Sequence, residues 1–401
     1  MPNDNQKFNI ICLSNQLWDF PNWTNKRHVM TRLAKRGHNV LFVDPPINLG
    51  RVFLRQVSRG HWSLQRILTQ TKKAPSGALI YTPINIVPSK FITSRIHARR
   101  IKKLANKHFP ENKKTLLWIY HMEIANLPTY LKTLKEKRDL LIYDCVDNYE
   151  AFPQYDTEKK KTEIRQKESY LASKSNLVFA TTPGLVDKLK KYTEDVHFTP
   201  NVGDFEKFYQ AKKKIEEIPA EIKQIPQPRV GFAGSLDEYK FDADLMKKVA
   251  KEHPHIQFVL IGQIALKDKK AAPESLGLDN IPNIHFLGQK PYETLEKYYA
   301  GFDGYIIPYK LNEYTVGGCF PVKFHDALAV GLPTVVTDLP AYLPFKDVSY
   351  IAKDYDQFSQ MVQDSLIEDE PKKIRERQKV AKENSWDGKV TQMLDIIKSS
   401  L

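Results

Sequence analysis

The stretch that decides the fold runs from residue 304 to 338 and reads G-Y-I-I-P-Y-K-L-N-E-Y-T-V-G-G-C-F-P-V-K-F-H-D-A-L-A-V-G-L-P-T-V-V-T-D. Its apolar start, residues 305–307, is typical of a buried strand. A loop with paired glycines, Gly317 and Gly318, follows. Pro321 then falls in the first turn of a predicted helix, a position that tolerates a missing N–H. The pattern therefore predicts a strand, a glycine-containing loop and a helix in sequence.

The helix has a clear end as well as a clear beginning. Gly331 and Pro333 are stop signals, and residues 334–337 return as a second strand. The beginning of the helix directs its free N–H groups and the positive end of its dipole into the glycine-containing loop. Such a helix start suits a phosphate or diphosphate.

Two charged residues refine this prediction. Lys323 and Asp326 lie three positions apart, so they share one face of the helix. A cation near phosphates and a carboxylate one turn deeper, within reach of sugar hydroxyls, suit a nucleotide diphosphate-sugar. The alternative is that any α/β protein contains strand–loop–helix units with Gly and Pro at their turns.

The specific residues favour the first interpretation, because they resemble a known family. The segment resembles the donor-binding region of GT-B glycosyltransferases, particularly the family 4-like group that builds teichuronic acids. That group reads P-x-K-x-x-E-Y-L-A-x-G-x-P-V-V, against Pro321, Lys323 and Asp326 through Val336 here. The ribose-binding Glu of the family is Asp326 in this chain, and the family's earlier acidic residue falls on Gly318.

The resemblance implies a fold: α/β, of the GT-B type, with two Rossmann-like doubly wound domains facing a cleft. The C-terminal helix would cross back to the N-terminal domain. We expect an acceptor- and membrane-facing domain over residues 1–204 with helix 386–401, and a donor-binding domain over 205–385. The proline-bearing stretch 204–228 is predicted to connect them.

Composition limits the possible classes of protein and the cellular compartment. A chain of 401 residues with 41% hydrophobic residues fits two ordinary globular domains. No apolar run is long enough for a membrane-spanning helix, and the first residues lack the layout of a signal peptide. The three cysteines, Cys12, Cys145 and Cys319, have no C-x-x-C spacing, so neither a disulfide framework nor a zinc site is indicated. We expect a cytoplasmic protein.

The net charge of +14 is concentrated in one segment. Residues 51–115 hold fifteen Lys or Arg and one acid, so the rest of the chain is neutral. Within the segment, bulky apolar residues alternate with bases, including Arg95, Arg99, Arg100 and Lys103. Such helices suit an anionic membrane surface. A solvated basic face is the plain alternative, and nucleic-acid binding is less favoured because no recognition motif accompanies the charge.

Short apolar runs alternate with helical patterns along the whole chain, which indicates parallel α/β sheets. In the first half the predicted strands are residues 8–13, 40–43, 116–120, 140–143 and 177–181. In the second half they are residues 229–233, 256–261, 284–287, 305–307 and 334–336. Ligand sites are expected at the carboxyl ends of these strands.

The predicted donor site collects the residues that follow the strands of the second half. Gly234 would permit close backbone approach to a phosphate. By resemblance, the loops after the other strands border the nucleotide, the base and the sugar. The full predicted set is Gly234, Ser235, Gln263, Leu287, Gly288, Tyr309, Asn312, Glu313, Thr315, Gly317, Gly318, Lys323 and Asp326.

A D-x-D sequence at Asp242–Asp244 matches the metal signature of the other large glycosyltransferase fold. We assign it instead to a helix start, where acids at the cap and in the first turn are favoured. No His, Cys or acid cluster has metal-ligand spacing elsewhere. We therefore expect no metal and no cofactor, with the nucleotide-sugar as a substrate.

In the first half, a strand leads into Asp144 and Asp147, which match the D-x-x-D of the teichuronic-type enzymes. This half also resembles the xanthan-assembly glucuronosyltransferase, in which an Asp of this region acts as general base. An inverting transfer needs such a base, whereas a retaining one does not. Asp147 is the first candidate for base or acceptor contact, with Asp144 or a purely structural cap as alternatives. By the fold's layout, Trp18, Asp19 and Arg27 would bind the acceptor, although a cap and a surface base are equally open.

These expectations combine into one hypothesis. The chain would be a peripheral enzyme on the inner face of the cell membrane that moves a sugar, most simply from a uridine diphosphate donor, to a lipid-linked saccharide. Its partners would be the donor, the acceptor and the anionic membrane, without nucleic acid. The alternatives are a nucleotide-sugar 2-epimerase of the same fold and a non-catalytic membrane- or nucleic-acid-binding protein.

Overall fold

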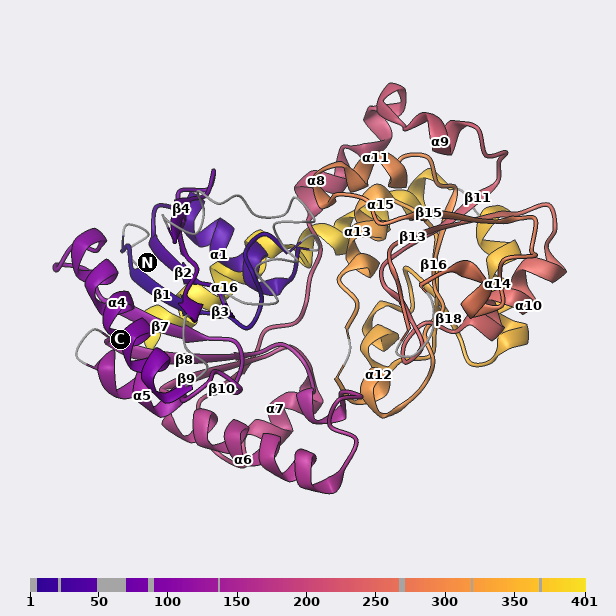
Figure 1. Cartoon of the computed structure of the whole chain (residues 1–401). Coiled ribbons are helices and arrows are strands. Elements are labelled where there is room, and N and C mark those ends of the chain that lie inside the picture. The colour runs from indigo at the N-terminus through magenta and orange to yellow at the C-terminus, as the bar shows by residue number, and fades with distance from the viewer. Residues whose placement is uncertain are drawn as a thin grey trace. The chain divides into compact units, whose positions relative to one another are not determined.

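The structure is a computed structural model that describes residues 6–20, 23–48, 70–85, 90–135, 138–266, 271–318, 320–367 and 370–401. The chain forms two compact units (Figure 1). Unit 1 comprises residues 1–199 and 390–401, and unit 2 comprises residues 200–389. The boundary near the C-terminus falls inside helix α16 (Trp386–Ser399), whose first residues belong to unit 2 and whose remainder belongs to unit 1.

Unit 1 is built on an eight-stranded sheet with the order β10-β9-β8-β7-β1-β2-β5-β4. Neighbouring strands pair in parallel, except that β4 and β5 are antiparallel. The strands are β1 (Asn9–Leu13), β2 (Asn39–Val43), β4 (Thr71–Lys73), β5 (Leu79–Tyr81), β7 (Thr115–Ile119), β8 (Leu140–Cys145), β9 (Leu177–Ala180) and β10 (Val196–Phe198). The strand order reverses at β1 and β7, and ligands of such sheets bind at the carboxyl ends beside this point.

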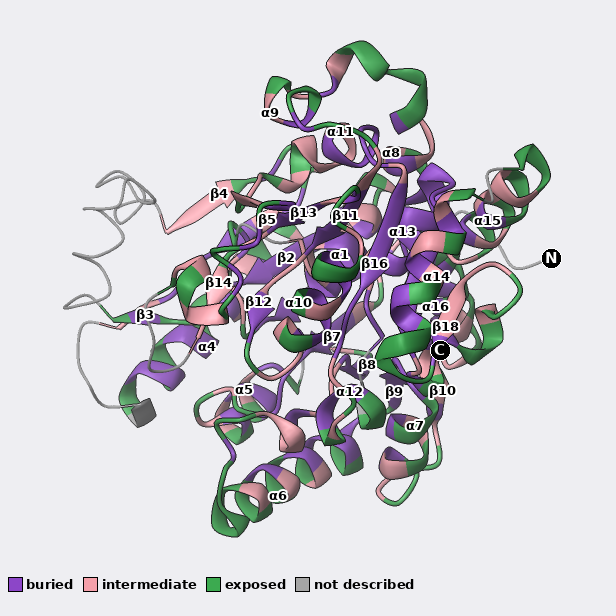
Figure 2. Cartoon of the chain, turned by 90° about the vertical axis from the view of Figure 1, so that its right-hand side faces the viewer, coloured by how far each residue is buried: buried purple, intermediate pink, exposed green. Residues whose placement is uncertain are grey.

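The helices of unit 1 explain why its central strands read as continuous apolar runs. They are α1 (Asn25–Lys35), α4 (Lys90–His108), α5 (Leu127–Thr133), α6 (Glu158–Lys174) and α7 (Pro183–Leu189), with the 3-10 turn η2 (Tyr149–Ala151). β1, β8 and β9 are buried at every residue, and Figure 2 labels β8 and β9 among its purple ribbons. A parallel sheet covered on both faces requires such strands. Two short strands, β3 (Ile47–Asn48) and β6 (Ile84–Asn85), pair separately.

Unit 2 contains a six-stranded, fully parallel sheet with the order β15-β13-β11-β16-β17-β18. Its strands are β11 (Arg229–Ala233), β13 (Gln257–Ile261), β15 (Ile284–Gly288), β16 (Gly304–Ile307), β17 (Thr334–Thr337) and β18 (Tyr350–Ala352), and β12 (Leu236–Asp237) pairs with β14 (Ile264–Ala265). Its helices are α8 (Phe205–Tyr209), α9 (Ala220–Lys223), α10 (Ala243–Glu252), α11 (Leu295–Tyr299), α12 (Glu313–Gly318), α13 (Lys323–Val330), α14 (Tyr355–Ile367) and α15 (Pro371–Glu383). The remaining turns are the 3-10 segments η3 (Ala211–Lys213), η4 (Ile215–Glu217), η5 (Pro273–Leu276), η6 (Tyr292–Thr294) and η7 (Pro340–Phe345).

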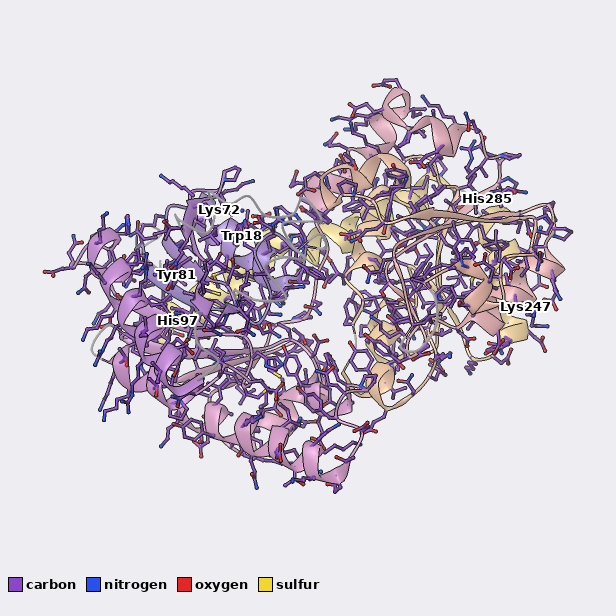
Figure 3. All side chains as sticks on the ribbon, in the orientation of Figure 1. Trp18, Lys72, Tyr81, His97, Lys247 and His285 are labelled. Carbon is purple, nitrogen blue, oxygen red and sulfur yellow. The ribbon has the colours of Figure 1, made fainter. Side chains whose placement is uncertain are left out.

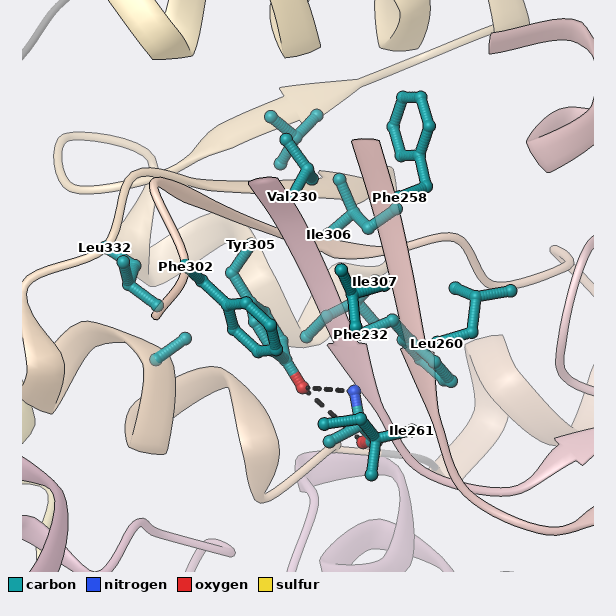
Figure 4. Close-up of a cluster of buried hydrophobic side chains, with 14 of the residues drawn as sticks. Val230, Phe232, Phe258, Leu260, Ile261, Phe302, Tyr305, Ile306, Ile307 and Leu332 are labelled. Carbon is teal, nitrogen blue, oxygen red and sulfur yellow. Dashed lines mark hydrogen bonds between the residues drawn. The ribbon is translucent and has the colours of Figure 1, made fainter. Parts of the chain in front are cut away.

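The order reverses between β11 and β16, and a buried tyrosine holds these two strands together. Tyr305 of β16 accepts a hydrogen bond from the Ala233 N–H at 2.9 Å and donates to the Ala233 carbonyl at 3.4 Å (Figure 4). Its hydroxyl also meets that of Tyr299 at 2.7 Å. These bonds fix the carboxyl end of β11, from which the predicted donor site begins.

The ten predicted strands all occur, with ends that differ by at most two residues. Two expectations were incomplete. Residues 313–318, expected as open loop, form the short helix α12. The stretch 204–228 is folded into unit 2, where Phe208 and Ile222 are fully buried in the core, because its apolar residues outweigh its prolines. The three-residue strands β4, β5, β10 and β18 were not predicted, and neither were the two-residue strands β3, β6, β12 and β14.

Candidate functional site

Three glycines lie at the carboxyl ends of adjacent strands in unit 2. Gly234 follows β11, Gly262 follows β13, and Gly288 ends β15. The Gly262 N–H donates to the Gly288 carbonyl at 2.9 Å, and the Gly234 N–H donates to the Ile261 carbonyl at 2.8 Å. Gly262 has φ +149°, and a methyl group there would overlap the Gly234 carbonyl. The backbones therefore approach more closely than side chains would allow, which leaves a floor made of main chain.

Lys323 lies directly against this floor. A methyl group on Gly234 would occupy the position of the Lys323 ammonium. The ammonium donates to the Tyr309 hydroxyl at 3.0 Å and lies 4.3 Å from the centre of the Phe232 ring. The first turn of α13 thus places a cation between the carboxyl ends of β11 and β16. A lysine in this position can bind an anion together with backbone N–H groups.

The beginning of α12 is held by a reciprocal cap. Asn312 accepts a hydrogen bond from the Thr315 N–H at 3.0 Å, and the Thr315 hydroxyl accepts one from the Asn312 N–H at 3.0 Å. The Asn312 amide also donates to the Tyr239 carbonyl at 2.6 Å. Asn312 and Thr315, which were both predicted to bind the sugar donor, therefore cap the beginning of α12. The N-x-x-T spacing carries this capping arrangement. Glu313 and Gly317 are exposed beside them, and Gly318 ends α12.

Asp326 lies one turn deeper than Lys323 and is only 5% exposed. Its carboxylate accepts a hydrogen bond from the Asp204 N–H at 2.8 Å, which secures the beginning of α8. The helix places Asp326 on the predicted face, and its contact with sugar hydroxyls stays a prediction. The adjacent His325 is fully enclosed by Phe320, Phe324 and Phe345, and burial lowers its pKa to about 3.

The remaining predicted donor residues border the glycine floor. Ser235 and Leu287 are half-buried, Gln263 is exposed, and the Gln263 carbonyl accepts the Leu236 N–H at 3.0 Å. Asp242 caps α10 by accepting the Leu245 N–H at 3.0 Å, as predicted for the D-x-D sequence. Across the described ranges, no three His, Cys, Asp or Glu side chains are grouped so that they could hold a metal ion.

In unit 1, the two candidate acids lie at the end of β8 but differ in exposure. Asp144 is fully buried, and the Trp118 indole N–H donates to its carboxylate at 3.2 Å. Asp147 is half-buried just past the strand, where its carbonyl accepts the Tyr149 N–H at 3.1 Å. A substrate can therefore reach Asp147 more readily than Asp144.

Sequence reasoning missed a third charged residue here, Lys26. It is 7% exposed in the first turn of α1, and its ammonium lies 5.4 Å from the centre of the Tyr120 ring. It interacts electrostatically with both acids. Lys26 stands next to Arg27 in a polar run, so no local pattern distinguishes it from a surface base.

The predicted acceptor residues lie near one another in unit 1, with different surroundings (Figure 3 labels Trp18 and Lys72). Trp18 is 4% exposed and packs edge-on against Phe42. Asp19 pairs with Lys72 at the surface. The Arg27 guanidinium lies 4.1 Å from the Trp23 ring centre. In this structure the Trp18 indole contributes to packing, and its acceptor role stays a prediction.

The predicted membrane-facing residues lie on one side of α4. Arg95, Arg99, Arg100 and Lys103 are all exposed. Ile92 and Ile96 lie among them and are 57% and 55% exposed. The apolar and basic residues of 51–69 that were part of the same prediction lie outside the described residues. No helix in the described part of the chain is long and apolar enough to cross a membrane.

Part of unit 2 matches a known family of proteins. Residues 227–366 match the family "Glycosyl transferases group 1", so unit 2 contains a group 1 glycosyltransferase domain. TuaH of Bacillus subtilis (strain 168), named as a candidate teichuronic acid biosynthesis glycosyltransferase, is 29% identical over 216 residues. That match covers 51% of each protein, so the chain aligns with about half the length of this curated relative.

Solved structures extend the likeness to the whole fold. Sucrose-phosphate synthase from Thermosynechococcus elongatus has a TM-score of 0.68 at 14% identity, covering 98% of this chain and 99% of that one. Anabaena HepE in complex with UDP has a TM-score of 0.67 at 14% identity, covering 98% and 100%. These are GT-B glycosyltransferases, so the predicted GT-B fold is confirmed.

Proposed function

We propose that this protein is a glycosyltransferase that moves a sugar from a nucleotide diphosphate-sugar, with uridine as the nucleoside, to a lipid-linked saccharide. The observation that carries the proposal is the Lys323 ammonium on the glycine floor of a group 1 glycosyltransferase domain. The Lys323 ammonium at the start of α13 would bind the diphosphate and stabilise its charge as it departs. Uridine is suggested by the HepE structures, which were solved with UDP and with UDP-glucose.

In the transfer, the acceptor hydroxyl oxygen forms a bond to the anomeric carbon of the donor sugar. The bond from that carbon to the diphosphate breaks, and its electron pair leaves with the diphosphate. Asp147 takes the hydroxyl proton. Because the Lys323 ammonium meets the charge of the diphosphate, the proposed reaction uses no metal ion.

Nucleotide binding tests the proposed donor site. UDP-sugars should raise the melting temperature of the full chain in a thermal-shift screen, and Lys323→Met should abolish that shift. Lys310→Met is the matched control, because Lys310 is a nearby lysine whose ammonium bonds the Glu238 carbonyl at 3.0 Å. If no nucleotide-sugar stabilises the wild type, the donor assignment is wrong.

Product formation tests the reaction. Release of UDP from a stabilising UDP-sugar should require a lipid-linked saccharide and should survive EDTA. Conversion of the UDP-sugar into an epimer without acceptor would identify the epimerase instead. Binding without turnover under all acceptor conditions would favour a non-catalytic protein.

The proposal also includes a surface that binds anionic membranes. Exposed arginines and lysine on α4 would meet lipid phosphates, while Ile92 and Ile96 enter the interface. Changing Arg95, Arg99, Arg100 and Lys103 to Gln should release the protein from vesicles that contain phosphatidylglycerol. The matched control changes four exposed bases of α15, Lys372, Arg375, Lys379 and Lys382, to Gln. Equal loss of binding in both variants would mean that net charge, rather than the α4 surface, governs adsorption.

A further inference from the structure

Residues 146–150 directly follow β8 and contain the candidate base, and we call them the β8 loop. Hydrogen bonds tie this loop to two neighbouring segments of unit 1. The Thr181 hydroxyl, just past β9, donates to the Val146 carbonyl at 3.0 Å. The Tyr149 hydroxyl donates to the Tyr120 carbonyl, just past β7, at 3.2 Å. The loop is therefore attached to the ends of the strands on both sides of it.

Bases from two helices hold the polar side chains at the far end of the β8 loop. The Lys188 ammonium of α7 donates to the Asn148 amide oxygen at 3.4 Å and lies 3.5 Å from one Glu150 carboxylate oxygen. The other Glu150 oxygen forms an ion pair with Arg165 of α6 at 2.8 Å. Lys188 thus contacts two side chains of the same short loop.

A buried carboxylate fixes the Lys188 ammonium in turn. Glu168 of α6 is 2% exposed, lies 2.7 Å from that ammonium and accepts the Tyr143 hydroxyl of β8 at 3.0 Å. Burial by itself would lower the pKa of Lys188, but Glu168 and the other neighbouring acids outweigh burial and raise it, so the ammonium stays charged. An ammonium has three N–H donors. Glu168, Asn148 and Glu150 offer it three acceptors.

Stability explains only one of these three contacts. Glu168 needs a cation beside it, because a buried charge without a partner is strongly destabilising. The contacts with Asn148 and Glu150 are longer, and the Lys188 and Glu150 side chains are 20% and 21% exposed, so these contacts add little to the free energy of unfolding. Their effect is to join the β8 loop to the anchored lysine.

We propose that Lys188 is a positioning residue for the transfer, because it fastens the β8 loop to α6 and α7 and so keeps the Asp147 carboxylate where the acceptor hydroxyl meets it. This inference rests on the proposed glycosyl transfer and adds to it a residue of α7. Lys188 acts through the loop and not on the substrate itself. A misplacement of about 1 Å can cost about 100-fold in rate, so a loosened loop should lower kcat and leave donor binding unchanged.

The loop side of these contacts provides the first test. Asn148→Ala combined with Glu150→Gln, which we call the loop variant, keeps the buried pair of Lys188 and Glu168. Its kcat should fall about 10- to 100-fold, while KM for the donor and the melting temperature stay close to wild type. Lys190→Met, an exposed lysine two positions farther along, is the control and should behave as wild type. An unchanged kcat in the loop variant would overturn the proposal.

The lysine side separates positioning from stability. Lys188→Met leaves the buried Glu168 without this cation, so the melting temperature should fall. Adding Glu168→Gln removes the buried charge and should restore the melting temperature, while kcat stays as low as in the loop variant. Recovery of kcat together with the melting temperature would mean that Lys188 only stabilises the fold, which would overturn the proposal.

A double-mutant cycle tests whether the effect passes through Asp147. If it does, adding the loop variant to Asp147→Asn should lower kcat by less than about twofold further, because residues that act as a unit are not additive. Losses that multiply would mean that the loop acts independently of Asp147, and the positioning role would be wrong.

Amide exchange tests the loop without any substrate. The N–H groups of Tyr149 and Ala151 donate to the carbonyls of Asp147 and Asn148, both at 3.1 Å. Both amides should exchange faster in the loop variant than in wild type and Lys190→Met. Equal protection in all three proteins would overturn the positioning role whatever their activity. A wild type whose loop behaves as expected but which transfers no sugar would instead contradict the proposed function.

Discussion

The carboxyl ends of the two sheets are built from different materials. In unit 2 the site is built largely of main chain, with three glycines as a floor and the Lys323 ammonium against it. In unit 1 the site consists of side chains, where Lys26, Asp144 and Asp147 are packed among buried aromatic rings. The same architecture thus supports two kinds of chemistry.

The difference corresponds to the two tasks proposed for them. A diphosphate carries its own charge and needs many donors in a fixed array, which backbone N–H groups supply at little entropic cost. A hydroxyl proton needs an acceptor whose pKa is tuned, and burial beside opposite charges is how proteins tune it. The predictions below test whether the two sites really differ in this way.

The largest effect is expected from Asp147→Asn in unit 1. Loss of the proton acceptor should lower kcat by about 100- to 10,000-fold, while UDP-sugar affinity stays at the wild-type value. Steady-state kinetics and calorimetric titration measure the two quantities. Asp187→Asn, an exposed acid of α7, serves as control. A variant that retains more than half of wild-type kcat would remove Asp147 from the mechanism and leave a retaining transfer, which needs no base.

Next in size is Gly234→Ala in unit 2. The added methyl group would displace the Lys323 ammonium, which is the mobile end of a flexible side chain, so the fold should survive. Loss of one charge-assisted contact should weaken UDP binding about tenfold or more. Gly388→Ala is the control, because its methyl group would have no atom closer than 3.4 Å. Unchanged UDP affinity in Gly234→Ala would mean that Lys323 does not bind the diphosphate.

Asp326 distinguishes a structural contribution from a binding one. Asp326→Ala leaves the Asp204 N–H without its acceptor, so the free energy of unfolding should drop by about 1–3 kcal/mol, and donor affinity should fall as well. Asp326→Asn keeps an oxygen for that bond, so it should preserve stability while still lowering the affinity for the UDP-sugar. Denaturant unfolding and UDP-sugar titration separate the two effects. If Asp326→Ala binds donor as tightly as wild type, its role is confined to α8.

The smallest expected effect is a loss of stability at acidic pH, which both units should show because each contains a buried histidine. Burial lowers the pKa of His121 in unit 1 to about 4 and that of His325 in unit 2 to about 3. Their unfolded pKa is higher, so the unfolded chain binds more protons as the pH falls below about 6.5, and stability is lost in that direction. Between pH 7 and pH 5.5, each histidine should lower the free energy of unfolding by about 1 kcal/mol.

Amide exchange of β8 and β17 at the two pH values measures this loss in each unit separately. His121→Gln should reduce the acid sensitivity of β8 alone, and His325→Phe that of β17 alone. Reduced sensitivity in both strands from either substitution would mean that the units unfold together.

The local structure around the predicted donor site could be inferred from the sequence where its signals are local. A glycine after a strand, a proline at a helix start and a lysine three positions before an acid can all be found within a few residues of one another. The positions of Gly234 and Lys323 could therefore be inferred, but their mutual contact could not, since it joins β11 to α13 across the sheet. The cap between Asn312 and Thr315 was present in the spacing but was not predicted, and the contact of both residues with a donor stays a prediction.

The sequence by itself determined the alternation of apolar runs and turns that makes two parallel sheets, because burial on both faces demands continuous apolar strands. It also determined which acids follow β8. Only the tertiary structure decided that Lys26 is buried where it interacts electrostatically with those acids, since the side chains come from segments far apart in the chain. The charge state of a buried group depends on the neighbours that folding brings to it, and no local pattern records them.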